Sequence, residues 1–353
     1  MEDIEVLYAV ACIRKRPGMY VLDVHDRSGL HWLARMLFEE FIEEHRRERC
    51  FRLEVTIHAS GALTLESDGN VLPLHGRKCA EVLLTTIGCA PSWDMSFVCA
   101  NALAESLFVE IRQGGRCYTQ SYRRGQAQTP MMCIGATEKT GVRLTLRPDP
   151  EIFDNPQFDG HLVSRMMGEQ AFLNPGLHFI FYDERSGRRE TFHGRGLAEW
   201  VTRLTEGQSA FPKEPLVFRH AHPGKSLQAA LLWTRHRTPR LRGFVNLRPV
   251  PEGAHVEGLV EGLAQALHRA RLARYGYRAP WAAERLKEGL VGIIEMRGDA
   301  LEVGGSCRER LEGAETKATI RQFVCEAFTE QLSRHEELCV ELCKLTELSA
   351  SRD

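Results

Sequence analysis

The sequence lacks a basic excess. Its 46 Lys and Arg residues are balanced by 47 Asp and Glu residues, which gives a formal net charge of -1 over 353 residues. A protein that binds nucleic acid on its own usually carries a clearly basic face. Contact with DNA would therefore depend on local patches, for which 14–16, 46–49 and 235–248 are the candidates, or on a partner. We interpret the first two runs as solvated faces.

Signals of export and of membrane insertion are also missing. The eleven Cys residues form no Cys-x-x-Cys pair, and the N-terminus has neither a basic nor an apolar leader segment. No apolar run approaches the length that spans a bilayer. An odd number of thiols without a leader is typical of a reducing compartment. We therefore expect a cytoplasmic protein with reduced thiols and no membrane segment.

The first 200 residues contain a mixture of helix and strand patterns. Apolar spacing predicts an amphipathic helix over 30–45, and alternation predicts a strand over 52–58 that returns after Gly61. Further helices are predicted over 7–13, 80–86, 97–104 and 162–172, and further strands over 107–112, 117–122, 142–147 and 178–182. This order predicts an α/β sandwich, in which helices cover one face of a mixed sheet.

A second domain is expected after the stretch 206–215, which is rich in Gly, Pro and polar residues. We place the two domains at 1–207 and 208–353. Beyond this boundary, strands are predicted over 226–234, 242–250 and 290–296, with a helix over 256–274 and a long helical pattern over 315–348. The alternation predicts a βαβ unit.

Short motifs follow one another along nearly the whole chain. The first is Arg14-Lys15-Arg16-Pro17-Gly18-Met19-Tyr20. Later ones include Gly29-Leu30-His31, Glu81-Val82-Leu83, Asn101-Ala102-Leu103, Thr137-Glu138-Lys139-Thr140-Gly141, Phe172-Leu173-Asn174, Phe244-Val245-Asn246, Glu252-Gly253-Ala254-His255 and Lys287-Glu288-Gly289-Leu290. Each motif alone is weak, but their order makes the set specific. The sequence resembles the B subunits of DNA gyrase and topoisomerase IV, which belong to the type IIA topoisomerases.

The resemblance implies a fold for each domain. It implies a GHKL-type ATPase-like α/β sandwich over 1–207, followed over 208–353 by a transducer domain of ribosomal-protein-S5-like topology with a long C-terminal helix. The family's next region, the metal-binding Toprim domain, has no counterpart in this sequence. We therefore expect that this chain alone neither cleaves nor rejoins DNA.

Two positions on the first long helix depart from the family pattern. Met36 stands where the family has the glutamate that acts as general base on water, and a thioether accepts no proton. Glu40 stands where the family has an asparagine that ligates Mg²⁺. A carboxylate binds Mg²⁺ but adds negative charge beside a triphosphate. Because Glu43 and Glu44 crowd the same turn, we interpret this segment as an acidic, solvated helix face.

The positions that would contact the adenine base are changed as well. Alignment on Pro73 puts Ser67 at the family's adenine-binding aspartate and Gly69 at the first glycine of that motif. A serine offers a weaker, uncharged hydrogen bond. A one-residue slip would instead give the role to Asp68, and this alternative stays open. The family's threonine that helps to hold the base falls at Val142, which has no hydroxyl.

The lid and the loop whose lysine contacts the γ-phosphate in the family depart furthest from the family pattern. Where the family has a long lid with a glycine-rich phosphate loop, only residues 87–95 stand here. Glycines let successive N–H groups surround phosphate oxygens, so their loss removes that cradle. We interpret Trp93 as an apolar plug over the vacated pocket. The segment Ser306-Cys307-Arg308 replaces the family's Gln-Thr-Lys loop, and Arg308 keeps a cation with a different geometry.

One set of metal-ligand types occurs near the C-terminus. His335, Cys339 and Cys343 would share one face of the final helix, and imidazole with thiolates suits zinc. No fourth ligand is evident. We therefore predict no metal site and interpret the three residues as part of a partly buried stripe.

The fold-bearing motifs persist while the chemistry-bearing ones change. We predict no catalytic residue, no cofactor and no ATP hydrolysis, with ATP and Mg²⁺ bound only if the degenerate site still binds them. The positions equivalent to the family's nucleotide contacts are Glu40, Ser67, Asp68, Gly69, Pro73, Val142 and Arg308.

The predicted role is that of a binding or regulatory paralogue. The expected partner is a second copy of the chain or a topoisomerase subunit, with DNA reached through that partner. One alternative is a functional ATP-dependent topoisomerase component that works with a separate cleavage subunit. Another is a new small-molecule site near Ser67, Glu40 and Trp93.

Overall fold

The chain divides into two compact units. The computed structural model describes residues 9–75, 79–87, 95–222, 224–236, 238–276, 286–305, 309–334, 337–342 and 344. The contacts within the chain group it into residues 1–194 and residues 195–353. Helix α6 (Leu197–Leu204) belongs to the second unit because it packs against strands β10 (Ala210–His222) and β11 (Lys225–Thr234). The expected boundary at 207 follows this helix, whereas the observed division precedes it.

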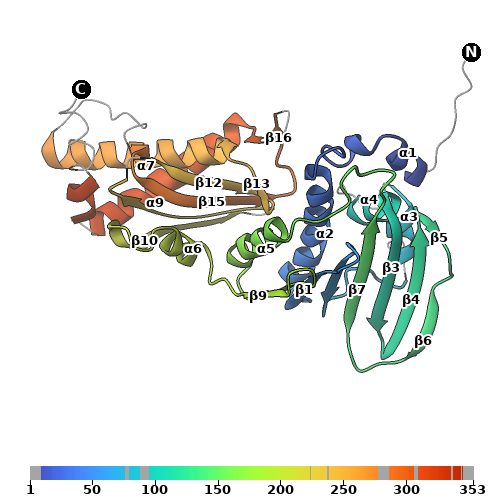
Figure 1. Ribbon diagram of the computed structural model, residues 1–353. Helices are drawn as coiled ribbons and strands as arrows, with labels where there is room; N and C mark the ends of the chain where they lie inside the picture. The colour runs from blue at the N-terminus through green and yellow to red at the C-terminus, as the bar shows by residue number, and fades with distance from the viewer. Residues whose placement is uncertain are drawn as a thin grey trace, which may run out of the picture. The chain divides into compact units, whose positions relative to one another are not determined.

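A nine-stranded mixed sheet forms the base of the first unit (Figure 1). Its strands are β1 (Arg52–Ile57), β2 (Leu63–Ser67), β3 (Ala104–Gln113), β4 (Arg116–Arg123), β5 (Gln126–Ala127), β6 (Met132–Ala136), β7 (Gly141–Pro148), β8 (His178–Asp183) and β9 (Arg188–Phe192). Their order is β5-β4-β3-β7-β2-β1-β8-β9, and β6 also pairs with β4. Strands β1 and β8 are parallel, and the other described pairs of this sheet are antiparallel.

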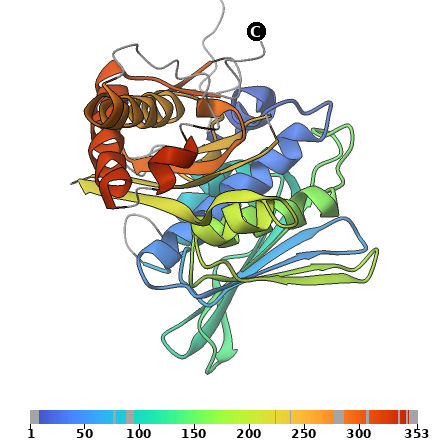
Figure 2. The same cartoon turned by 90° about the vertical axis from the view of Figure 1, so that its left-hand side faces the viewer.

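Helices lie on one face of this sheet, as the two views show (Figures 1 and 2). They are α1 (Ala9–Lys15), the 3₁₀ helix η1 (Pro17–Met19), α2 (Ser28–Arg46), α3 (Ala80–Thr85), α4 (Ser96–Leu103) and α5 (Gly160–Leu173). Alternate strand positions such as Leu53 and Val55 are buried, as are the apolar positions Leu33 and Leu37 of α2. Burial of these faces joins the two layers, and the predicted α/β sandwich is confirmed.

The second unit has a five-stranded sheet, ordered β10-β11-β15-β12-β13, and a small sheet, ordered β14-β17-β16. Its remaining elements are β12 (Arg240–Val245), β13 (Arg248–Pro249), β14 (Glu252–Gly253), α7 (Ala254–Tyr275), β15 (Leu290–Gly298), β16 (Val303–Gly304), β17 (Arg310–Leu311) and α9 (Ala314–Arg334). Strands β12 and β15 are parallel with α7 between them in sequence, which confirms the predicted βαβ unit.

The two long helices α7 and α9 pack closely together in the second unit. A Cβ atom on Gly258 or Gly262 would lie 2.8 Å from the Lys317 carbonyl oxygen or 2.7 Å from the Arg321 carbonyl oxygen. Glycine at both positions therefore lets the helix backbones approach. Among the described residues, no helix combines the length and apolar character needed to cross a membrane.

The stretch 206–215, at the expected domain boundary, contains the start of β10 at Ala210. This is an edge strand, and edge strands accept proline. One predicted strand in this unit is wrong in its extent. The strand predicted over 242–250 is interrupted at Asn246 and Leu247, whose φ angles of 47° and 71° form a turn between β12 and β13. The helical pattern predicted over 315–348 is described as α9 (Ala314–Arg334), and residues 337–342 are helical as well.

Candidate functional site

Strands β2 and β7 bring two predicted base-contacting positions together. Ser67 and Val142 are register partners, and their exposed fractions are 3% and 0%. Gly141, just before Val142, has a φ of +113°, and a Cβ atom there would lie 1.9 Å from the Ser67 carbonyl oxygen. A side chain at this position would force the strands apart, so glycine sets the close approach.

The Ser67 hydroxyl is engaged within its own loop. It donates a hydrogen bond to the Gly69 carbonyl oxygen at 3.2 Å. A Cβ atom on Gly69 would lie 2.6 Å from the Cys50 Cβ and 2.9 Å from the Arg49 carbonyl oxygen. Burial raises the pKa of the Cys50 thiol to about 12, so a neutral thiol lies beneath the loop. Packing against residues 49–50 is therefore sufficient reason for glycine at 69.

Asp68 holds the start of the neighbouring strand. Its Oδ1 atom accepts hydrogen bonds from the backbone N–H groups of Phe51 at 2.9 Å and Arg52 at 3.0 Å. Arg52 is the first residue of β1. In the alternative alignment, in which Asp68 contacts the base, an adenine amine would share this carboxylate with the two intramolecular donors.

Helix α2 carries the positions equivalent to the base and the metal ligand. Met36 is buried, with 7% of its surface exposed. Glu40 is half-buried, and its Oε1 atom accepts a hydrogen bond from the Ser96 hydroxyl at 2.8 Å. Ser96 is the first residue of α4. The Glu40 carboxylate therefore joins two helices, and a bound cation would have to share it with that hydroxyl.

The prediction of a solvated acidic face is wrong for Glu44. This residue is only 5% exposed. Its Oε1 atom lies 3.1 Å from Arg47 Nη1 and 2.8 Å from Arg49 Nη2, because the chain after α2 places both guanidinium groups beside it. Glu43 pairs with Arg46 at 2.9 Å. The charges at this helix end are thus paired within the chain.

Two further family motifs have structural roles here. The Pro73 carbonyl oxygen accepts from the backbone N–H of Ala80, the first residue of α3, at 2.8 Å. Asn101 is fully buried, and its Nδ2 atom donates to the carbonyl oxygens of Leu84 at 2.8 Å and Gly125 at 3.2 Å. These bonds fix α3 and α4 around the loop that follows Ser67.

Several predicted positions lie outside the described residues. These are Trp93 with most of the shortened lid, Ser306-Cys307-Arg308, His335 and Cys343. Cys339 is described and is buried. Within the described parts of the chain, no group of three or more His, Cys, Asp or Glu residues is arranged to hold a metal ion.

Sequence reasoning missed the bond between Ser96 and Glu40 and the anchoring of β1 by Asp68. The partners are separated by 56 residues in the first case and by 16 and 17 in the second. No local pattern marks such pairs, because they form only when distant segments pack together.

Comparison with known proteins finds sequence relatives of this chain. A family model for DNA gyrase B matches residues 196–352. The DNA gyrase B subunit from Archaeoglobus fulgidus is 28% identical over 345 residues, which cover 92% of this chain and 54% of that protein. The type 2 topoisomerase B subunit from Aquifex aeolicus is 26% identical over 360 residues, covering 96% and 45%. The chain thus spans about half the length of these curated relatives.

Solved structures give the same result for the fold. The 43K ATPase domain of Thermus thermophilus gyrase B, solved with an aminocoumarin, has a TM-score of 0.84 at 24% identity, covering 98% of this chain and 96% of that one. The B subunit of DNA gyrase from Myxococcus xanthus has a TM-score of 0.83 at 29% identity, covering 95% and 99%. By its sequence matches and its fold, this chain is a protein similar to the B subunits of DNA gyrase and topoisomerase IV.

Proposed function

We propose that this gyrase B-like chain does not hydrolyse ATP and acts as a binding or regulatory paralogue. The observation that carries the proposal is Met36, which is buried on α2 at the position equivalent to the family's general base. A thioether cannot take a proton from water. Loss of a general base lowers a rate by roughly 10² to 10⁴.

Three carboxylates at or near the altered positions are engaged with protein donors. Glu40 accepts from Ser96, Glu44 pairs with two arginines, and Asp68 accepts from two backbone N–H groups. Each carboxylate would have to be shared with these intramolecular donors if it activated water or bound a metal. This supports a reaction that is lost rather than relocated to a neighbouring residue.

The sequence of the lid gives independent support. Residues 87–95 contain a single glycine, Gly88, in place of the family's glycine-rich phosphate loop. A cradle of consecutive N–H groups requires backbone conformations that glycine adopts most easily. We infer that the triphosphate has lost its principal backbone contacts as well as its general base.

The proposal is tested by phosphate release from ATP with and without Mg²⁺. We expect the purified chain to release no phosphate above a buffer control. A Glu40→Gln variant serves as the matched control, because release by a contaminating enzyme would be the same in both preparations. Mg²⁺-dependent release by the natural chain that disappears in Glu40→Gln would refute the proposal and favour a functional ATPase with relocated residues.

The proposed partners are a second copy of the chain or a topoisomerase subunit, through which DNA would be reached. The relatives' names as B subunits support an assembly of this kind. Because we expect no nucleotide-driven closure, the oligomeric state should be the same with and without ATP. Size-exclusion chromatography with light scattering tests this, and an ATP-dependent dimer would contradict it.

A further inference from the structure

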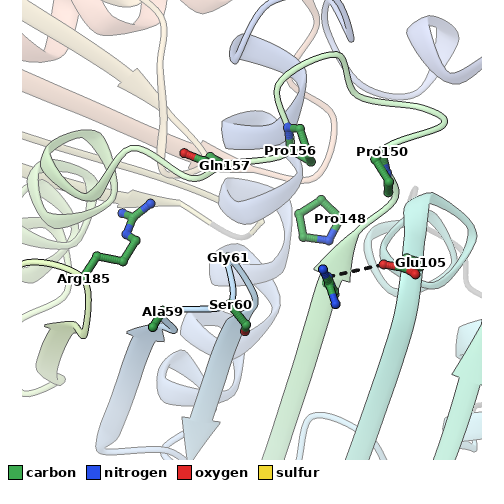
Figure 3. Close-up of a pocket in the computed structure, with 10 residues that line it drawn as sticks. Ala59, Ser60, Gly61, Glu105, Pro148, Pro150, Pro156, Gln157 and Arg185 are labelled. Carbon is green, nitrogen blue, oxygen red and sulfur yellow. Dashed lines mark ion pairs between the residues drawn. The ribbon is translucent and has the colours of Figure 1, made fainter.

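Two cavities open at the end of the first unit's sheet that lies away from Ser67. The turn 59–61 precedes β2, whereas Ser67 ends that strand. The first cavity, of about 220 Å³, is lined by this turn and by residues of the loop after β7 (Figure 3). The second, of about 350 Å³, is lined by Arg27, 157–161 and residues of the β8–β9 hairpin. They share Gln157 and Arg185, and together we call them the rim pocket.

Four guanidinium groups line the rim pocket. They come from separate segments: Arg27 precedes α2, Arg147 lies on β7, Arg185 lies in the β8–β9 turn and Arg188 begins β9. Figure 3 shows the Arg185 side chain extending from its turn toward the loop that carries Gln157. Three carboxylates, those of Glu105, Asp159 and Asp183, line the same walls.

The carboxylates of the larger cavity are already used by the protein. Asp183 Oδ1 and Oδ2 accept from Arg185 Nε at 2.9 Å and Nη2 at 2.7 Å, and Oδ1 also accepts from the Arg185 backbone N–H. These hydrogen bonds lower the pKa of Asp183, which therefore stays ionised. Asp159 Oδ1 accepts from the backbone N–H groups of His161 and Leu162 at the start of α5.

The cationic side chains have hydrogen-bond donors to spare. A guanidinium group has five N–H donors, and Arg185 uses Nε and one Nη2 donor on Asp183. Arg27 Nε and Nη2 donate to the Asn155 side-chain oxygen at 3.2 Å, whereas its Nη1 lies 3.9 Å from Asp159 Oδ2, which is too long for a hydrogen bond. Arg188 Nη2 donates to Glu190 Oε1 at 2.8 Å and to Ser164 Oγ at 3.4 Å, which leaves its Nε and part of its Nη1 for a ligand. The larger cavity therefore offers more donors than acceptors, and an anion would satisfy them.

His161 adds another donor. Its Nδ1 atom lies 2.7 Å from Arg188 Nη1. A guanidinium nitrogen can only donate, so Nδ1 accepts and the imidazole proton is on Nε2. His161 lines the larger cavity with Arg27, Arg185 and Arg188. Donors on several walls suit a tetrahedral oxyanion better than a planar carboxylate, because its oxygens point in four directions.

The smaller cavity is suited to the remainder of a ligand. Pro148, Pro150 and Pro156 line it, and proline fixes the φ angle of its own residue. The walls are thus held in place before a ligand arrives, which lowers the entropic cost of binding. Because Arg185 and Gln157 border both cavities, a group bound in the larger one can extend into the smaller one.

We propose that the rim pocket binds the phosphate group of a small phosphate monoester, with inorganic phosphate as a weaker ligand of the same site. Arg27, Arg185, Arg188 and His161 hold the phosphate oxygens, and the proline-lined cavity accommodates the organic part. The site lies at the other end of β2 from the positions equivalent to the family's adenine contacts. It does not depend on the state of that nucleotide site.

The test is a titration of the ²H,¹⁵N-labelled full chain with inorganic phosphate and with glycerol 3-phosphate, followed by ¹H–¹⁵N spectra at constant ionic strength. We expect saturable shifts of the Gly61, Gly160 and Ser186 amides, with tighter binding of the monoester. The amides of the Gly114–Gly115 hairpin, which joins β3 to β4, serve as the internal control and should not move.

Substitutions then identify the groups that bind. Arg27→Gln should weaken both ligands by about tenfold or more, since a hydrogen bond to a charged group contributes on the order of 1.5–3 kcal/mol. Arg116→Gln, which changes an exposed arginine at the start of β4, should leave binding unchanged. Shifts that chloride or acetate reproduces equally, or that persist unchanged in Arg27→Gln, would overturn the proposal. Tighter binding of inorganic phosphate than of the monoester would overturn the role of the smaller cavity.

Discussion

Replacing Met36 by glutamate restores the family's carboxylate in form, but we expect it to damage the fold rather than to create an enzyme. Met36 is 7% exposed on α2. A carboxyl group placed there loses its hydration, and burial raises the pKa of such a group by roughly 2–3 units. Since each unit corresponds to about 1.4 kcal/mol, the charged form would cost on the order of 3–4 kcal/mol. Total stabilities are about 5–15 kcal/mol, so the loss is large.

The cost has a definite dependence on pH. Between the pKa in the unfolded chain, about 4.3, and the raised pKa in the folded chain, the native state binds more protons than the unfolded state. Stability relative to the natural chain therefore falls as pH rises through this interval. At pH 4 only the loss of methionine packing remains. The isosteric control Met36→Leu should cost less than about 1.5 kcal/mol at every pH.

Hydrogen exchange followed by mass spectrometry measures this pH-dependent loss of stability for α2 separately from the second unit. We expect exchange of the α2 amides in Met36→Glu to accelerate from pH 5 to pH 8, after correction for intrinsic rates, and Met36→Leu to show no such dependence on pH. A Met36→Glu variant as protected as the natural chain at pH 8 would show that position 36 faces water, and the argument from a buried thioether would fail.

Two further substitutions test the packing. His255 is fully buried, and burial lowers its pKa to about 4. It therefore contributes stability above pH 6.5 that is lost as pH falls toward 4. The free energy of unfolding, measured with urea, should fall by about 3 kcal/mol over this range, and His255→Asn should remove this pH dependence. An unchanged pH profile in that variant would refute the assignment. Gly141→Ala should destabilise the first unit by more than about 2 kcal/mol, because its Cβ would meet the Ser67 carbonyl oxygen, whereas Gly114→Ala, with a φ of +62° and nothing within 4 Å, should cost about 1 kcal/mol. If thermal unfolding showed equal losses of stability in Gly141→Ala and Gly114→Ala, the close approach of β2 and β7 would be contradicted.

Much of the fold could be predicted from the sequence because its elements carry strong local patterns. The helix expected over 30–45 is α2, and the strand expected over 52–58 is β1. The Gly-Gly turn at 114–115 joins β3 to β4 as its chemistry predicts. For these elements the observed burial agrees with the apolar periodicity of the sequence, so the sequence pattern alone predicts them.

Two of the elements that were missed lack such patterns. Strand β6 consists of exposed residues, and β5 is two residues long. The two differ from a loop only through their pairing with β4. No alternation of buried and exposed side chains marks them, because an edge strand of this kind buries no face.

For the candidate site, the structure shows the backbone arrangement. Ser67 and Val142, which the alignment assigns to one nucleotide site, are register partners on β2 and β7. The side-chain partners of Glu40, Glu44 and Asp68 could not be predicted, because each depends on how distant segments or a helix end fold back. These partners are set by tertiary packing rather than by local sequence.

The central claim, that this chain no longer hydrolyses ATP, is tested most directly by a single-turnover experiment. Labelled ATP is mixed with Mg²⁺ and a large excess of the purified full chain, and labelled phosphate is followed over hours. We predict that the label stays in ATP, at the rate of the buffer blank. Conversion of the label to phosphate faster than in the blank, and faster than with the Glu40→Gln chain, would contradict the account.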